Sequence, residues 1–153
     1  FVVSDDWSKV SFCSMNLIAN GDGFALACRP GKLIARMGWD MKDRRGKHQL
    51  GWLRGIGETL IRARHDPLMV ALGGRILRHT VGVRTILEHN PYKLSYDGTG
   101  HIRPEDVYAF YLRRYNAQHS DIIDAVQYLE SADIFTRKID HPLIVHMAKV
   151  DTG

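Results

Sequence analysis

Acidic side chains are the first candidates for chemistry in this chain. Asp5 and Asp6 are adjacent, and two carboxylates at the end of a strand can bridge two Mg²⁺ ions for phosphoryl transfer. Asp22 lies between two glycines and has no second carboxylate nearby in the sequence to share a cation. Residues 20–23 (NGDG) instead have the composition of a tight hairpin turn, where Gly, Asn and Asp tolerate a positive φ. We therefore interpret Asp22 as part of a bend.

Histidine and cysteine give no stronger candidate. His141 and His146 are five residues apart, a spacing that does not bring two imidazoles to one face of a helix. Cys13 and Cys28 form no Cys-x-x-Cys pair, so the sequence predicts reduced thiols and neither a zinc ribbon nor a disulfide framework. We assign no catalytic residue and no metal-binding residue to this chain.

Glycine pairs in the middle of the chain resemble phosphate-binding loops only superficially. Gly55 with Gly57, and Gly73 with Gly74, lie inside helical patterns and lack the preceding strand and the lysine of such a loop. We expect these glycines to allow helices to pack closely.

Length and composition are those of one soluble globular domain. The 153 residues are 44% hydrophobic and 25% charged, which is enough apolar material for a core without a stapling disulfide or metal. The longest aliphatic run, residues 143–145, is too short to span a bilayer, and the N-terminus lacks the layout of a signal peptide. We expect an intracellular chain with no membrane segment.

Positive charge is concentrated in one part of the chain. Between Arg29 and Arg64 there are ten lysines and arginines but three acidic residues. Such a local excess is typical of a protein that binds a polyanion, since phosphate neutralisation drives binding that does not depend on sequence. A solvated charged face gives the same pattern, so charge alone leaves both interpretations open.

The elements that must position these residues begin with a β-hairpin. Residues 9–19 and 24–29 alternate as two strands, with Asn20 opposite Gly23, so that Leu17 pairs with Leu26. One face then carries mostly apolar side chains, including Met15 and Phe24, and is expected to pack on the core. The other face is small and polar and ends in a base, and is expected to remain open to another backbone; it comprises Ser14, Asn16, Ile18, Ala25, Ala27 and Arg29.

The remainder of the chain is predicted to be helical. Asp66-Pro67 is typical of a helix start, and Pro104-Glu105-Asp106 is another, with Arg113-Arg114 matching the dipole at its end. Loops are expected at residues 40–47 and 90–100, and a short helix or turn at residues 32–38. Helices are expected at residues 48–64, 67–79, 104–114, 120–130 and from 142. The fold class is therefore α+β, an N-terminal β-hairpin followed by a mostly helical bundle.

Several motifs resemble those of a known family. Residues 10–14 (VSFCS), a hairpin, residues 29–33 (RPGKL) and Gly38-Trp39 resemble the C-terminal part of RNA-dependent RNA polymerases of positive-strand RNA viruses, particularly noda-like and tombus-like replicases. The similarity continues less specifically through residues 52–55 and 66–68. It implies that Phe12, Cys13 and Ser14 mark motif E, that residues 1–38 form the junction between palm and thumb, and that residues 39–153 form a helical thumb-like domain.

The resemblance also implies partners and sites. Residues 1–6 resemble the strand and Ser-Asp-Asp turn that hold catalytic metal in some viral polymerases, but Phe12 follows Asp6 too closely for that arrangement. The catalytic aspartates, their Mg²⁺ and the bound nucleoside triphosphates would therefore lie in the palm and fingers of the parent polymerase, outside this chain. The parent would act in the host cytoplasm, in replication complexes attached to membranes through its other parts. Template and product RNA would contact Ser14, Asn16, Arg29, Lys32, Arg36 and Arg54.

Two alternatives remain open at the level of sequence. The chain could be a free-standing α+β RNA-binding or interaction domain, whose basic segment would bind phosphates equally well. It could also be a small metal-dependent enzyme that uses Asp5 and Asp6. The polymerase interpretation depends on a hairpin whose apolar side is buried and whose opposite side, with Ser14, Asn16 and Arg29, faces a nucleic-acid strand.

Overall fold

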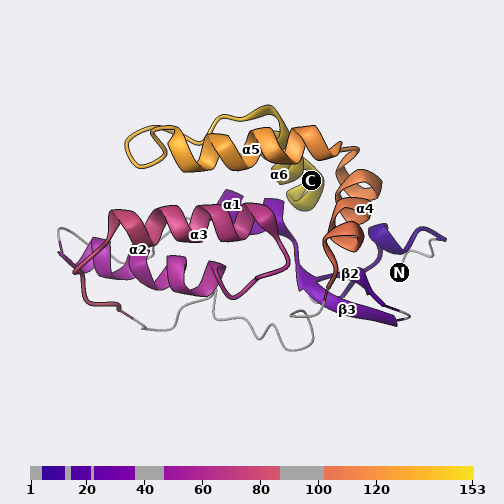
Figure 1. The fold of residues 1–153 in the computed structure, drawn as a ribbon, viewed down its shortest axis with the longest axis horizontal. Helices are drawn as coiled ribbons and strands as arrows, with labels where there is room; N and C mark the ends of the chain where they lie inside the picture. Colours follow the sequence, from indigo (N-terminus) through magenta and orange to yellow (C-terminus); the bar gives the residue numbers. More distant parts are fainter. Residues whose placement is uncertain (1–4, 13–14, 22, 37–46, 87–101) are drawn as a thin grey trace.

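The structure is a computed structural model that describes residues 5–12, 15–21, 23–36, 47–86 and 102–153. A small antiparallel sheet at the N-terminal end is followed by helices, so the predicted α+β class is confirmed (Figure 1). The strands, in the order β1-β2-β3, are β1 (Ser11–Phe12), β2 (Met15–Asn20) and β3 (Gly23–Cys28), preceded by a short 3₁₀ helix, η1 (Trp7–Lys9).

The helices match the predicted segments closely. Helix α3 has the predicted bounds, whereas α2 ends four residues before the predicted position. Of the predicted loop at residues 40–47, residues 40–46 lie outside the described residues, and Lys47 is the first residue of α2 instead. The predicted loop at residues 90–100 also lies outside the described residues. The bounds are α1 (Pro30–Arg36), α2 (Lys47–Leu60), α3 (Pro67–His79), α4 (Pro104–Tyr115), α5 (His119–Ser131) and α6 (Pro142–Thr152).

Helix starts follow from capping chemistry. The Asp66 carboxylate accepts hydrogen bonds from the backbone N–H groups of Leu68 and Met69, each at 3.0 Å, and Pro67 occupies the first turn of α3. At α5 the backbone N–H of Gln118 donates to Asp121 at 2.8 Å, so the helix begins one residue earlier than predicted.

The hairpin of β2 and β3 has the predicted register. Leu17 pairs with Leu26, and Asn20 pairs with Gly23 across a bend in which Gly21 has a φ of +63°. The bend is therefore confirmed, although Asp22 itself lies outside the described residues. The prediction of one continuous strand over residues 9–19 is wrong, because Phe12 pairs with Met15 and the chain reverses between β1 and β2.

The prediction of which hairpin face is buried is also wrong. Ile18 and Ala27 are buried against the bundle, where α4 packs on β2, and Asn16 is fully buried with them. Phe24 is 55% exposed and Leu26 39% exposed on the opposite face. Alternation fixed which residues share a face, but both faces contain apolar residues, so it could not decide which face meets the helices.

The helices form a layered bundle. Helices α2 and α3 lie side by side, α5 packs on the other side of α3, and α1 packs against α6 (Figure 1). At the α2–α3 crossing, a Cβ on Gly73 would lie 2.9 Å from the Gly57 carbonyl oxygen, so the prediction of close packing is confirmed for Gly57 and Gly73. It is wrong for Gly74, where a Cβ would meet only Arg78, at 3.5 Å. None of the described helices is both long and apolar enough to cross a membrane.

Candidate RNA-binding surface

The carboxylate of Asp151 joins the hairpin region to the end of the chain. It is 3% exposed, and its Oδ2 accepts hydrogen bonds from the backbone N–H of Gly31 at 2.8 Å and from the Tyr115 hydroxyl at 2.8 Å. A third donor is the backbone N–H of Lys32, at 3.3 Å. The first turn of α1 is therefore capped by a residue of α6, since the orphan N–H groups at a helix start need acceptors.

Arg114 neutralises this buried carboxylate. Its Nε and Nη2 each lie 2.8 Å from Asp151 Oδ1, and its side chain is 8% exposed. Its Nη1 also donates to the Ser8 carbonyl at 3.0 Å, so Arg114 joins η1 to Asp151. Burial and the Asp151 charge raise the pKa of Tyr115 far above its ordinary value, so the hydroxyl remains a donor.

Gly31 is required where α1 meets α6. A Cβ at this position would overlap the Met147 carbonyl and lie 2.7 Å from Asp151 Oδ2. The Pro30-Gly31 pair therefore begins the helix and also allows its backbone to approach α6. The start of α1 is fixed in position by close packing, by hydrogen bonds and by charge.

Several residues predicted to contact RNA have structural roles. Arg29 donates from Nη1 to the Asp151 carbonyl at 3.2 Å, and its Nε is buried without a hydrogen-bond partner among the described residues. Asn16 is 0% exposed, and neither atom of its amide has a hydrogen-bond partner there. Neither side chain is presented on an open hairpin face as predicted. Ser14 and Cys13 lie outside the described residues, and Phe12 lies in β1.

Arg54 holds the end of a helix. Its Nη1 donates to the Leu77 carbonyl at 3.2 Å and to the Thr80 carbonyl at 3.0 Å, and Glu58 lies 3.7 Å from its Nε. These carbonyls end α3, where no further helical N–H is available to them. The guanidinium is thus committed to the α2–α3 pair.

Lys32 and Arg36 are the predicted RNA ligands that the structure brings together. Both lie on α1, four residues apart, so they share one face of the helix. Arg36 is exposed and Lys32 is half-buried. The Asp151 cap fixes the helix that carries them, so the two cations form a positioned pair.

Two of the acidic and histidine candidates, Asp6 and His141, have capping roles. Asp6 accepts hydrogen bonds from the Ser8 hydroxyl at 2.6 Å and from the Ser8 N–H at 3.0 Å, and this hydroxyl lowers the pKa of Asp6. His141 caps α6 by accepting from the Leu143 N–H, and its Nε2 lies 2.7 Å from Asp124. Within the described ranges, no group of three or more His, Cys, Asp or Glu side chains is placed to hold a metal.

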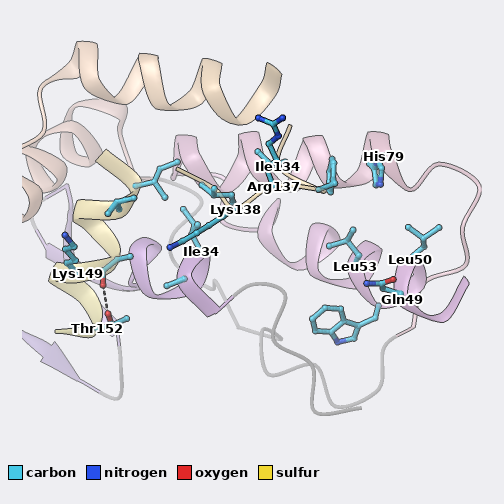
Figure 2. Close-up of a pocket in the computed structure, with 17 residues that line it drawn as sticks. Ile34, Gln49, Leu50, Leu53, His79, Ile134, Arg137, Lys138, Lys149 and Thr152 are labelled. Carbon is cyan, nitrogen blue, oxygen red and sulfur yellow. Dashed lines mark hydrogen bonds between the residues drawn. The ribbon is translucent and has the colours of Figure 1, made fainter. Parts of the chain in front are cut away.

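A cleft of about 670 Å³ lies beside α1 and α6, and no feature of the sequence predicts it. Figure 2 shows Ile34, Lys138, Lys149 and Thr152 at one end and Gln49, Leu50 and His79 at the other. Its walls come from α1, α2, the end of α3, residues 134–139 and α6. Sequence patterns could not reveal it, because its lining residues extend from Ile34 to Thr152 along the chain.

Comparison of the chain with protein-family models, with curated proteins and with solved structures gave no match.

Proposed function

We propose that this chain is the motif E and thumb portion of a viral RNA-directed RNA polymerase and that it supports the product strand beside the active site. The open hairpin face expected for this role is not present, because Asn16 is fully buried and Arg29 donates to the Asp151 carbonyl. The observation that carries the proposal is instead the junction of hairpin and helix. A hairpin of the expected register leads directly into α1, and the buried Asp151 fixes that helix with Lys32 and Arg36 on one face. The sequence motifs at residues 10–14 and 29–33 supply the resemblance to polymerases.

The role of these residues is to bind and orient RNA. Lys32 and Arg36 would contact phosphates, which position a strand without reading its bases. The parent polymerase would supply two-metal chemistry, in which a primer 3′-hydroxyl attacks the α-phosphate of an incoming nucleotide. Catalytic aspartates, Mg²⁺ and nucleotide belong to its palm and fingers.

The outer face of the hairpin favours a polymerase portion over a free-standing domain. Phe24 and Leu26 are exposed there, on the side opposite to the bundle. Exposed apolar side chains that cluster on a sheet are typical of a surface that packs against more protein. The remainder of the polymerase is the partner that the resemblance implies for this surface.

RNA binding by the chain tests the role of α1. We expect the Lys32→Ala/Arg36→Ala variant to bind a labelled oligoribonucleotide about tenfold more weakly, with a shallower dependence of log K on log salt. The matched control is Arg103→Ala/Arg113→Ala, which removes two exposed charges, one at the residue before α4 and one within α4. Equal losses in both variants, or no loss in the first, would reject the α1 assignment.

The coding sequence upstream of Phe1 tests the polymerase itself. A Gly-Asp-Asp or Ser-Asp-Asp turn encoded several tens of residues before Phe1 would support a palm domain in the same protein. An in-frame stop codon there would instead support the free-standing RNA-binding domain.

A further inference from the structure

The cleft between α1, α2 and α6 combines an apolar floor with a cationic rim. Eleven of its seventeen lining residues are apolar, and Ile34, Trp52, Ile134 and Ile144 form a buried floor. Arg137, Lys138 and Lys149 are exposed at its margin (Figure 2). Its volume of about 670 Å³ is large enough for several side chains of a partner.

The charge of the cleft is entirely of one sign. Among the described residues that line it, three are lysine or arginine and none is acidic. Lys138 and Lys149 form no ion pair with a carboxylate within the described part of the chain. Arg137 lies near Asp133, whose pKa is lowered by hydrogen bonds from Thr136 and also by the Arg137 charge. The rim therefore complements an occupant that carries negative charge beside apolar groups.

The lining chemistry favours a peptide over RNA as this occupant. Single-stranded RNA binds where bases can stack on exposed aromatic rings. Trp52 is only 8% exposed, and the Phe135 ring is stacked on His79 with their centroids 3.8 Å apart. Aliphatic side chains fill most of the surface, and these match the apolar stripe of a helix laid in a groove.

We propose that this cleft is a docking site for an acidic amphipathic helix of a partner protein. Leucine-like side chains of that helix would enter the floor between Ile34, Leu53 and Ile144, and its carboxylates would face Lys138 and Lys149. Lys32 and Arg36 do not line the cleft, so RNA and the helix would contact different side chains.

Binding of two matched peptides tests the proposal. The probes are a helical peptide of about four turns, with leucines at i, i+4, i+7 and i+11 and flanking glutamates, and the same peptide with lysine in place of glutamate. We expect the acidic peptide to bind at least about tenfold more tightly than the basic one. Equal affinity, or no saturable binding of the acidic peptide, would overturn the proposal.

Charge reversal locates the peptide. The Lys138→Glu/Lys149→Glu variant should lose at least about tenfold in affinity for the acidic peptide. The control, Arg62→Glu/Arg64→Glu, makes the same change of charge at exposed residues between α2 and α3 and should retain the affinity. Equal losses in the two variants would indicate attraction to net charge alone and would contradict a specific site.

Isoleucine methyl NMR identifies the occupant without any variant. The acidic peptide should shift the methyl signals of Ile34, Ile134 and Ile144 and leave those of Ile18 and Ile122 unchanged. If an oligoribonucleotide shifts the first group instead, the cleft is an RNA site and the peptide proposal fails. If a rise in protein concentration alone shifts them, a second copy is the occupant. RNA binding that depends on Lys32 and Arg36 is unaffected by any of these outcomes.

Discussion

The hairpin and the α2–α3 pair differ in how their sequences determine their packing. In α2 and α3, Asp66, Pro67 and the glycines at the crossing all specify the same arrangement. In the hairpin, the register follows from the sequence but the buried side does not, because Ile18 and Leu26 lie on opposite faces. Local signals therefore determine helices, whereas the orientation of a small sheet depends on the elements that pack on it.

The largest predicted effect on stability is at Asp151, which joins α1 to α6. Asp151→Ala removes the cap of α1 and leaves Arg114 buried without its counterion. Loss of one partner from a buried pair costs about 3–5 kcal/mol, and urea denaturation would measure it. Arg103→Ala breaks a solvent-exposed ion pair and should cost less than about 1 kcal/mol. Similar losses in both variants would mean that the cap does not stabilise the fold.

Paired truncations in the hairpin test which face is buried. Ile18 is 1% exposed, so Ile18→Ala should lower the free energy of unfolding by about 2–4 kcal/mol. Leu26→Ala, at a residue that is 39% exposed, should cost well under half as much. Thermal or urea denaturation distinguishes the two, and the reverse ranking would restore the face predicted from alternation.

Adjacent glycines in α3 test the helix pair. A Cβ on Gly73 would lie 2.8 Å from Ile61 Cγ2 and 2.9 Å from the Gly57 carbonyl oxygen, so Gly73→Ala should cost about 1–3 kcal/mol. Gly74→Ala would meet only the flexible end of Arg78, at 3.5 Å, and should stabilise the helix by about 0.5–1 kcal/mol. Opposite signs in chemical denaturation are expected, and two stabilised variants would show that the crossing tolerates more volume.

Asn16 tests whether burial of this face of the hairpin lowers the free energy of unfolding. Its amide is fully buried and has no hydrogen-bond partner among the described residues. Asn16→Leu keeps a similar shape without the polar atoms and should raise the free energy of unfolding by about 1–2 kcal/mol. Denaturation of the variant against wild type measures this. A loss of stability would reveal that the amide makes a favourable interaction.

The smallest predicted effect concerns the pH dependence at Asp66. Burial raises the pKa of its carboxyl above the ordinary 3.8, although nearby His65 and hydrogen bonds from Met69, Tyr111 and Leu68 oppose the shift. The native state then holds the proton more tightly than the unfolded chain. This contribution is fully present below pH 3.8 and is lost as the pH rises through the folded pKa.

Asp66→Asn removes this titration while keeping an acceptor for the cap. The stability of wild type relative to Asp66→Asn should therefore fall as the pH rises from about 3 to 7. Urea midpoints at several pH values measure the difference. A constant difference would show that the carboxyl has the same pKa in both states.

Local chemistry accounts for what could be predicted. The Asp66-Pro67 start, the Pro104 start and the Asn20–Gly23 pairing depend on residues close in sequence, and the structure confirms them. The chain reverses between Phe12 and Met15, where the sequence has no glycine or proline to indicate a turn. The sequence therefore does not predict β1 as a separate strand.

Long-range pairing explains most of what could not be predicted about the site. Arg29 and Arg54 have the charge of RNA ligands, but Arg29 donates to the Asp151 carbonyl and Arg54 to carbonyls at the end of α3. Charge alone cannot distinguish a cation that faces solvent from one that caps a helix. Lys32 and Arg36 share a helix face, and their role in binding RNA stays a prediction.

The Asp151 cap also has a consequence for folding during synthesis. The Gly31 N–H and its acceptor are 120 positions apart in the chain. A ribosome that makes the protein from its N-terminus therefore releases α1 long before α6 exists to hold it. Until then α1 has neither its cap nor its packing partner. Helices α2 and α3, which are close in sequence, can pair early. Docking of α1 on α6 is therefore expected to follow the pairing of α2 with α3.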